Sequence, residues 1–382
     1  MTNLLDFFTA RTDEMVRDLQ ALVLMESPTG DKAHVDRLST YLGSVCEQLG
    51  AEVRVYPREA VGDLRLAVWN GSAPGQPILL LCHIDTVWPV GTLEQMPLRQ
   101  ENGLLFGPGV LDMKGGVVVA LEAIRGLRER DELPPRPIWL FLNSDEETGS
   151  LHSRDLIHEL AGQCGLVLVM EPAAEGEALK TWRKGIARYT VRTVGRAAHS
   201  GNAPEAGINA VIEAAHQALY LHSLNDLPNG TSVSVTVIHG GIATNVIPAE
   251  AALEVDVRFL KAAEAERVDR AIQGLQPVLP GAQVIVSGGI DRGPMERDAQ
   301  MIRAARQAQT IARGLGLDLA EDGSGGASDG NFTAAMGIPT LDGIGAGGLG
   351  LHAAHEQVQI RTLPRRAAFV AKLLREWDMG AV

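Results

Sequence analysis

The stretch Ile78-Leu79-Leu80-Leu81-Cys82-His83-Ile84-Asp85-Thr86 decides the fold of this chain. An apolar run that ends in His-x-Asp is typical of a buried strand that reaches the carboxyl edge of a sheet. Residues two apart on a strand share a face, so Asp85 can lie beside His83, take its second ring N–H and make the free nitrogen a better metal ligand. By itself, however, a histidine at the end of a strand is more often structural than metal-binding.

Acids and histidines recur where further elements begin or end. They occur at Asp112 before an apolar helical pattern (117–127), at Asp145-Glu146-Glu147 after an apolar strand (138–142), at Glu171 after another (166–170), and in His352-Ala353-Ala354-His355-Glu356. Taken singly, each acid is better interpreted as a helix cap. Three apolar strands that end in His or acid nevertheless bring polar groups to one edge of a parallel sheet, where open α/β sheets bind ligands. The set predicts a mixed nitrogen and oxygen site for two zinc ions or similar metals.

Length and composition are those of a globular protein with two cores. The chain has 382 residues, of which 45% are hydrophobic, and this length exceeds one typical core. Three scattered cysteines in apolar surroundings, no basic leader and no apolar run near ~20 residues predict a cytoplasmic protein without a membrane span. A net charge of −13 disfavours nucleic acid as a partner.

The element pattern changes near residue 182. Before it, strands alternate with helical stretches, as in a doubly wound sheet. From 185 to about 286 the order is strand, helix, strand, strand, helix, strand, which is a ferredoxin-like order. We therefore expect a catalytic domain in two parts, 1–182 and 291–382, with an inserted domain at 183–290. A helix (299–315), a strand (339–341) and a closing helix (364–377) complete the second part.

The ordered set His83-x-Asp85, Asp112, Asp145-Glu146-Glu147, Glu171-Pro172 and His352 with Glu356 four residues later resembles the co-catalytic metallopeptidase family. That family includes acetylornithine deacetylase, succinyl-diaminopimelate desuccinylase, aminoacylase and bacterial glutamate carboxypeptidase, and the last branch looks most similar. The resemblance covers essentially the whole chain. It implies a zinc-exopeptidase-like α/β fold, with a doubly wound mixed sheet and an inserted ferredoxin-like domain that serves as lid and dimerisation domain.

The resemblance also implies a role for each motif. One zinc ion would be held by His83 and Glu171 and the other by Glu147 and His352, with Asp112 bridging; Co²⁺ or Mn²⁺ are possible substitutes. Asp85 would orient His83, and Glu146 would be the general base that takes a proton from water and returns it to the leaving amine. Asp145 is better interpreted as a surface residue, and His355 as an outer-shell or substrate-side residue.

The expected substrate residues come mainly from the inserted domain. Arg258 matches a family segment that binds the C-terminal carboxylate, although pattern alone fits a surface salt bridge equally well. His199 resembles a family histidine that crosses the dimer interface to stabilise an oxyanion. Asn245 could form a hydrogen bond to the same substrate. Arg292 either binds a second carboxylate or is exposed. The last candidates, Gly326 and Ser328, belong to a substrate-proximal loop.

A second motif points elsewhere. Gly345-Ala346-Gly347-Gly348-Leu349-Gly350 satisfies the dinucleotide pattern G-x-G-x-x-G, which should open a helix in a βαβ unit. Here it leads into His352 near the end of the chain, with no such unit after it. We therefore interpret these glycines as allowing close backbone approach.

Three functions fit the sequence. The first is a di-zinc carboxypeptidase that releases a C-terminal amino acid, foremost glutamate, from an N-acyl amino acid or short peptide. The second is an amidohydrolase that uses the same site to remove an acyl group from an amino acid. The third is a binding protein that has kept the fold without catalysis, against which the complete set of ligands and Glu146 argue.

Overall fold

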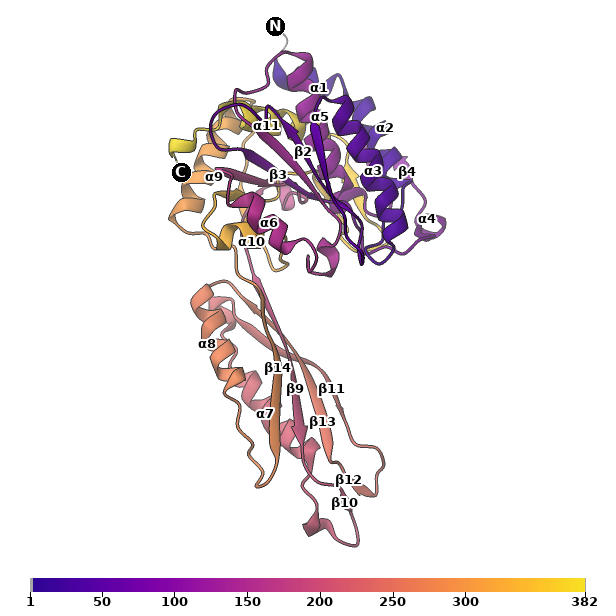
Figure 1. Ribbon diagram of the computed structural model, residues 1–382, viewed down its shortest axis with the longest axis vertical. Helices are drawn as coiled ribbons and strands as arrows, with labels where there is room; N and C mark the ends of the chain where they lie inside the picture. The colour runs from indigo at the N-terminus through magenta and orange to yellow at the C-terminus, as the bar shows by residue number, and fades with distance from the viewer. Residues whose placement is uncertain (1–2, 382) are drawn as a thin grey trace. The chain divides into compact units, whose positions relative to one another are not determined.

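The computed structural model describes residues 3–381, and the chain divides into two compact units. The first unit comprises Met1–Trp182, Glu296–Ser324 and Ser328–Val382, and the second comprises Arg183–Met295 and Gly325–Ala327. In Figure 1 the middle of the chain, pink to orange, forms the second unit, whereas both ends of the chain contribute to the first.

A six-stranded mixed sheet forms the centre of the first unit. Its strands, in spatial order, are β1 (Glu52–Tyr56), β2 (Leu64–Trp69), β6 (Ile138–Asn143), β3 (Ile78–His83), β7 (Leu166–Val169) and β16 (Thr340–Leu341). Strand β3 runs parallel to β6 and to β7, whereas β2 is antiparallel to β6. All six residues of β3 are buried, because the strand has neighbours on both edges and helices on both faces. The predicted α/β class with a mixed sheet is confirmed.

Helices cover this sheet. On one face, Leu79, Leu81 and Val169 pack in a single apolar cluster with side chains from α6 (Arg154–Ala161) and α10 (Gly330–Ala335). The alternate residues of β3 point the other way, and α5 (Gly115–Glu129) packs against that strand. The other helices are α1 (Leu4–Thr9), α2 (Thr12–Val23), α3 (Lys32–Gln48), α4 (Thr92–Gln95), α9 (Ala299–Arg313) and α11 (Thr362–Glu376).

Two small sheets complete the first unit. One has the order β17 (Gly348–Leu349), β18 (Gln357–Gln359), β5 (Leu104–Phe106) and β4 (Arg99–Glu101), and the other pairs β15 (Glu321–Ser324) with β8 (Leu179–Arg183). Because β17 and β18 flank residues 350–356, their pairing fixes both ends of the loop that carries His352.

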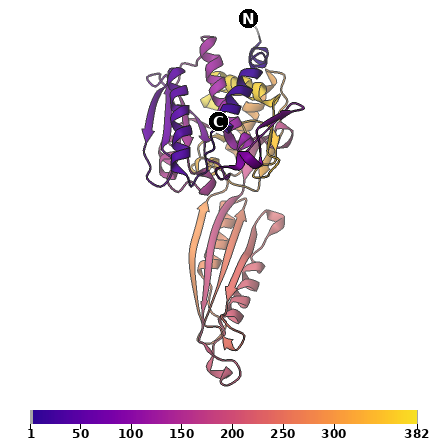
Figure 2. The ribbon, with the colours of Figure 1, turned by 90° about the vertical axis from the view of Figure 1, so that its right-hand side faces the viewer.

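The second unit is a ferredoxin-like sheet with two helices. Its elements follow the order β9 (Gly185–Val194), α7 (Ala210–Ser223), β11 (Ser232–Gly240), β13 (Glu250–Phe259), α8 (Ala262–Gln273) and β14 (Gln283–Arg292). The strands are all antiparallel, in the spatial order β11-β13-β9-β14. Both helices lie on the same face of the sheet (Figures 1 and 2) and bury alternate residues such as Val255, Val257 and Phe259 of β13. The predicted order of elements is confirmed, with an added ribbon of β10 (Ala198–His199) and β12 (Val246–Ile247).

Two further expectations concern the whole chain. Within residues 3–381, no helix has the length and apolar character needed to cross a membrane. Cys46, Cys82 and Cys164 are all buried and free of disulfides.

Candidate metal centre

The ends of three neighbouring strands bring the predicted ligands to one edge of the central sheet. His83 is the last residue of β3 and is in register with Asn143, the last residue of β6. Strand β7 ends at Val169, two residues before Glu171, and its register with β3 places Val169 beside Leu81. The convergence that we predicted from the apolar runs therefore holds for β3, β6 and β7.

Asp112 lies at the centre of the cluster. It stands in an irregular turn, Val110–Lys114, between Gly109, which has a φ of 69°, and the start of α5, and its peptide bond to Met113 is cis. Its Oδ1 lies 3.2 Å from His83 Nε2, and its Oδ2 lies 3.1 Å from His352 Nε2. Two imidazoles thus meet the two oxygens of one carboxylate.

Each of these imidazoles also faces a second carboxylate. Glu171 Oε1 is 3.3 Å from His83 Nε2, and Glu147 Oε2 is 3.2 Å from His352 Nε2. The donors therefore form two sets, His83 with Glu171 and His352 with Glu147, which share Asp112. These are the two sets that the family resemblance implies.

The donor set fits a pair of divalent cations. Each Nε2 has two carboxylate oxygens within 3.3 Å, but one ring N–H can serve only one of them fully. Glu147 Oε1 is buried and, among residues 3–381, has no hydrogen-bond partner. Ligand atoms of His83, Asp112 and Glu147 lie within 4.8 Å of one another. The cluster contains three carboxylates and two imidazoles, so its net charge is negative even when both imidazoles are protonated. Mixed nitrogen and oxygen donors suit zinc and similar ions.

The same contacts shift the protonation of the cluster. Burial alone would lower the pKa of His83, but hydrogen bonds to Asp112, Asp85 and Glu171 outweigh it and raise this pKa well above its ordinary value. Hydrogen bonds to Asp112 and Glu147 raise the pKa of His352 to about 10. Burial raises the pKa of Glu147, whereas the two histidines hold that of Asp112 below its ordinary range despite burial. Because a ligand imidazole must be neutral, binding of cations here would release protons.

Asp85 contacts more than His83. The Nδ1 atom of His83 is 3.0 Å from the backbone oxygen of Asp85 and 3.5 Å from its Oδ1. The fully buried carboxylate instead accepts the backbone N–H groups of Glu146 (3.3 Å) and Glu147 (3.2 Å) and the hydroxyl of Thr29 (2.7 Å). Asp85 therefore joins the His83 strand end to the turn that carries Glu146 and Glu147.

Our interpretation of Asp145 as a surface residue is wrong. Its side chain is completely buried and accepts the backbone N–H of His152 (2.7 Å) and the hydroxyl of Ser153 (2.6 Å), just before α6. Its backbone oxygen accepts the N–H of Ser150 (2.8 Å). Asp145 thus closes the turn that holds the next two glutamates, because an acid suits the N-terminal end of a helix.

The loop of residues 350–356 carries three polar side chains with different surroundings. The His352 side chain is 51% exposed and adopts a φ of 56° as it reaches Asp112. His355 is exposed, whereas Glu356 is 1% exposed and directed inward. The family resemblance selected His352 and not His355 as the ligand, and His352 is the residue whose Nε2 approaches Asp112 and Glu147.

The glycine-rich motif opens no helix. Gly348 and Leu349 form β17, which pairs antiparallel with β18. A Cβ on Gly345 would lie 2.1 Å from the backbone oxygen of Met170, so only glycine lets this loop approach the Glu171 segment. The interpretation as a close-approach motif explains this glycine better than a dinucleotide site does.

His199 and Asn245 lie together in the second unit. Ser200 donates its N–H to the Asn245 backbone oxygen (3.0 Å), and β10 pairs with β12. Both His199 and Asn245 are exposed. His199 Nδ1 accepts the N–H groups of Gly201 and Asn202 (3.1 Å each), which places the ring proton on Nε2 as a donor.

Arg258 and Arg292 lie in one row of the same sheet. Both are in register with Ile186 of β9, one on each side. Arg258 pairs with Asp256 through Nε (2.8 Å) and Nη2 (3.0 Å), which leaves Nη1 not engaged by that carboxylate. Arg292 is only 3% exposed, so the alternative of a simply exposed arginine is wrong.

The two loop candidates differ in accessibility. Gly326 is exposed, and its backbone oxygen accepts from Arg183 Nη1 (3.3 Å). Ser328 is fully buried, and its hydroxyl donates to Asp342 Oδ2 (2.7 Å). Ser328 therefore supports the loop from inside.

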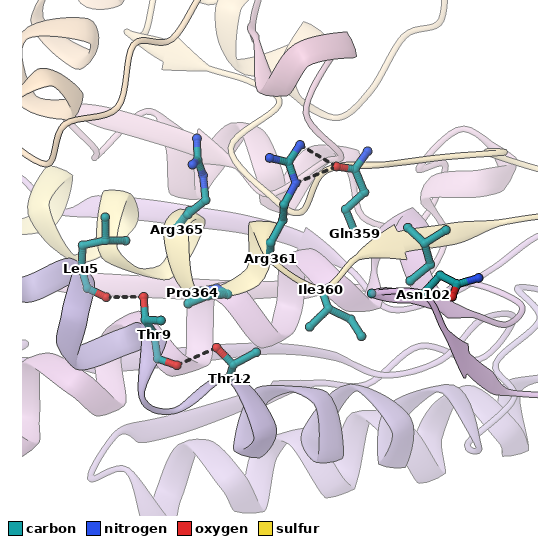
Figure 3. Close-up of a pocket in the computed structure, with 11 residues that line it drawn as sticks. Leu5, Thr9, Thr12, Asn102, Gln359, Ile360, Arg361, Pro364 and Arg365 are labelled. Carbon is teal, nitrogen blue, oxygen red and sulfur yellow. Dashed lines mark hydrogen bonds between the residues drawn. The ribbon is translucent and has the colours of Figure 1, made fainter.

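A groove of about 780 Å³ lies elsewhere on the first unit, between α1 and the start of α11 (Figure 3). Leu5, Ile360 and Pro364 are among its lining residues, and none of the predicted site residues is. Its arginines already have partners: Arg361 donates to Gln359 Oε1, and Arg365 pairs with Glu177.

Comparisons with known proteins agree with this geometry. The model of peptidase family M20/M25/M40 matches residues 79–376. Carboxypeptidase G2 of Pseudomonas sp. (strain RS-16) is 34% identical and covers 98% of this chain and 92% of its own length. Acetylornithine deacetylase of Aliivibrio fischeri (strain MJ11) is 30% identical over 66% of this chain and 68% of its own length. The crystal structure of aminopeptidase PepT from Bacillus cereus ATCC 10987 shares the fold, with a TM-score of 0.78 at 22% identity over 95% of this chain and 98% of that one. A family match over most of the chain, together with these relatives, shows that the chain belongs to peptidase family M20/M25/M40 and is a metallohydrolase.

Proposed function

We propose that this enzyme is a di-zinc hydrolase that cleaves an amide bond next to a free carboxylate. Its foremost activity would be that of a carboxypeptidase that releases C-terminal glutamate, or a similar amino acid, from an N-acyl amino acid or short peptide. The observation that carries the proposal is the sharing of Asp112 by two His and Glu pairs. The similarity to carboxypeptidase G2 over 98% of the chain supports a carboxypeptidase activity.

The proposed metal ligands are the five residues of the cluster. His83 and Glu171 would hold one ion, His352 and Glu147 the other, and Asp112 both; zinc suits these donors, and Co²⁺ or Mn²⁺ could replace it. When bound, two such ions lower the pKa of water and polarise the carbonyl of the scissile amide.

Glu146 is the proposed general base. The turn that begins after Asp145 directs the Glu147 carboxylate to His352, and the backbone N–H groups of both glutamates are held by Asp85. Adjacent residues project differently, so the Glu146 carboxylate would face the attacking water while the Glu147 carboxylate holds an ion together with His352. Glu146 would take the proton from the water and deliver it to the leaving nitrogen, which then departs as an amine.

The proposed substrate residues divide between two sites. Arg258, with Arg292 in the same row, would bind the free carboxylate through its Nη1 side, and His199 would donate to the oxyanion from Nε2. Arg258 is in register with Ile186 at the start of β9, whereas Glu250, near the β10–β12 ribbon, is in register with Val194 at its end. These positions are eight residues apart, roughly 26 Å at about 3.3 Å per residue. One small substrate cannot span this distance, so we propose that His199 and Asn245 act in the site of a second subunit.

Exposed apolar residues on the second unit support a homodimer through this domain. On α7, Ile212, Leu219 and Tyr220 are 47%, 72% and 47% exposed. Strand β11 is at the edge of its sheet and exposes Val237 and Ile238. An unpaired edge strand beside an apolar helix face is a surface that natural proteins cover.

Mixing two inactive variants tests this arrangement. We expect His199→Ala and Glu146→Gln, each inactive alone, to regain activity after subunit exchange. In a mixed dimer one site carries both defects and the other carries neither, so its rate should be about half that of the wild type. Random exchange should therefore restore about a quarter of the wild-type rate overall. The measurement is the hydrolysis rate after equimolar mixing.

Two controls accompany the mixture. Glu146→Gln mixed with itself should show no recovery, and exchange should be verified by mass spectrometry of subunits that carry different tags. Exchange without recovery would place His199 in its own chain's site or outside catalysis.

An N-acyl-amino-acid amidohydrolase is the second candidate. The similarity to acetylornithine deacetylase and to succinyl-diaminopimelate desuccinylase favours it, because both names describe removal of an acyl group from an amino acid. The same bond type is cleaved in both cases. The five residues of the cluster with Glu146 disfavour the third candidate, a non-catalytic binding protein.

A substrate panel separates the two hydrolases. We expect N-acyl glutamates and folates to be cleaved with a higher kcat/KM than acetylated or succinylated basic amino acids, in zinc- or cobalt-supplemented enzyme. Replacing the glutamate by its α-amide should abolish cleavage, because the carboxylate for Arg258 is then absent. A preference for the acetylated basic amino acids would support the amidohydrolase instead.

We also propose a cytoplasmic location and a small-molecule partner without nucleic acid. Three buried, free cysteines support a reducing compartment. The net charge of −13 opposes a polyanionic partner.

A further inference from the structure

Glu356 is buried beside the turn that carries Asp112, and both oxygens of its carboxylate accept hydrogen bonds. Its Oε1 accepts the backbone N–H groups of Leu111 (2.8 Å) and Asp112 (3.1 Å). Its Oε2 accepts the backbone N–H of Gly109 (3.0 Å) and the indole N–H of Trp88 (2.8 Å). The side chain is 1% exposed, so these four donors replace the water that an exposed carboxylate would have.

The turn that carries Asp112 depends on these bonds. Residues 110–114 depart from helical geometry at Asp112 and Met113, so the N–H groups of Leu111 and Asp112 lie outside a regular helical ladder. A buried N–H without a partner is destabilising, because its hydrogen bond to water is lost and not replaced. The Glu356 carboxylate alone accepts three backbone N–H groups of this turn, those of Gly109, Leu111 and Asp112.

Glu356 also lies on the loop that carries His352, four residues further along the chain. Asp112 is held at its backbone by Glu356 and meets His352 through its own carboxylate. The loop of residues 350–356 and the turn of residues 109–112 thus make two contacts. One is between the side chains of His352 and Asp112, and the other is between the Glu356 carboxylate and the backbone of the turn. The second contact does not use the side chains that would bind the cations.

We infer that Glu356 is a positioning residue of the metal centre, which sets the place of Asp112 relative to His352 and thereby the affinity for both ions. The inference rests on the metal centre proposed above. Glu356 has no contact with the ligand atoms themselves and acts only through the backbone of Asp112. Since Asp112 belongs to both donor sets, its displacement should weaken both ions and not one.

Glu356→Gln tests the inference with little change of shape. A glutamine offers one acceptor oxygen and one NH₂ group. Either the N–H pair of Leu111 and Asp112 or the pair of Gly109 and Trp88 would therefore face another donor. We expect the dissociation constants of both zinc ions to rise about 10–100-fold, as is usual for loss of a residue that orients ligands. The measurement is competition with a chromogenic chelator on metal-free protein, at a temperature well below its unfolding transition.

Two matched variants complete the experiment. Glu101→Gln makes the same change on a side chain that is 62% exposed in β4, and it should leave both constants unchanged. Trp88→Phe removes one of the four donors and keeps the carboxylate on the three backbone N–H groups, so its effect should be below tenfold.

The outcomes separate the alternatives. Unchanged constants in Glu356→Gln, with a loss of stability alone, would make Glu356 merely structural and overturn the inference. A loss confined to one ion would show that Glu356 acts through His352, which also overturns it. If Glu356→Gln does not fold, Glu356→Asp retains the charge one methylene short of its donors and decides by the same criteria. Wild-type protein that binds fewer than two ions would instead contradict the proposed metal centre.

Discussion

Replacing Glu146 by glutamine is expected to lower kcat by at least a factor of about 10²–10⁴ while the protein keeps about two metal ions per chain. Glutamine has nearly the shape of glutamate but cannot accept a proton from water. The backbone N–H of Glu146 is held by Asp85, so the turn does not depend on the Glu146 carboxylate. Steady-state kinetics together with elemental analysis of the same sample make the measurement.

The metal content decides between base and ligand. Glu159→Gln, the same change at an exposed position on α6, should retain both activity and metal. If Glu146→Gln loses metal in proportion to its activity, Glu146 is a ligand and the assignment to Glu147 must be exchanged. If the metal content is intact and kcat is unchanged, Glu146 is not the general base.

The apolar runs predicted the part of the fold that positions the proposed metal ligands. Residues 78–83 are buried on both faces, and such a run specifies a central parallel strand because only that environment covers every side chain. The change in element order after residue 182 predicted the ferredoxin-like sheet for a similar reason, since β13 alternates buried and more exposed residues. Both are local patterns, and local patterns are visible in a sequence.

The residues that hold the backbone around the candidate site were harder to predict from the sequence. Asp145, Asp85 and Glu356 are acids whose carboxylates bind backbone N–H groups of other segments. Backbone amides are the same for every residue type, so nothing in the partner's sequence marks them as acceptor sites. Asp145 therefore resembles a surface acid, and Glu356 is visible only as a spacing from His352. Thr29, which donates to Asp85 Oδ2 (2.7 Å), stands in no motif at all.

The proposed substrate residues illustrate a second limit to what the sequence can predict. Arg258 and His199 could each be recognised by a short motif, yet no motif states how far apart they lie. Strand register supplies that information, because Ile186 and Val194 are at opposite ends of β9. The separation within one chain, and not the residues themselves, is what favours a site completed by a second subunit.

Replacing Asp112 by alanine is expected to remove one or both metal ions and to reduce hydrolysis to background. Two dications about 3.5–4 Å apart repel by an amount on the order of 15–20 kcal/mol at an effective dielectric constant of about 20. Asp112 is the side chain whose two oxygens face the two imidazoles, so it is the anion placed to offset this repulsion. Elemental analysis after dialysis, with zinc titration in a calorimeter, measures the loss.

The number of metal ions lost distinguishes a carboxylate that bridges both ions from a residue that binds one. His83→Ala removes a ligand from one donor set, so it should cost one ion, and Asp318→Ala, at an exposed acid, should cost none. Glu356→Gln should weaken both ions in a way that excess zinc reverses, because the bridging carboxylate remains. Asp112→Ala should not be rescued by excess zinc, since the variant loses the one carboxylate whose two oxygens lie within 3.2 Å of His83 Nε2 and of His352 Nε2. Full occupancy in Asp112→Ala would show that Asp112 does not lie between the ions.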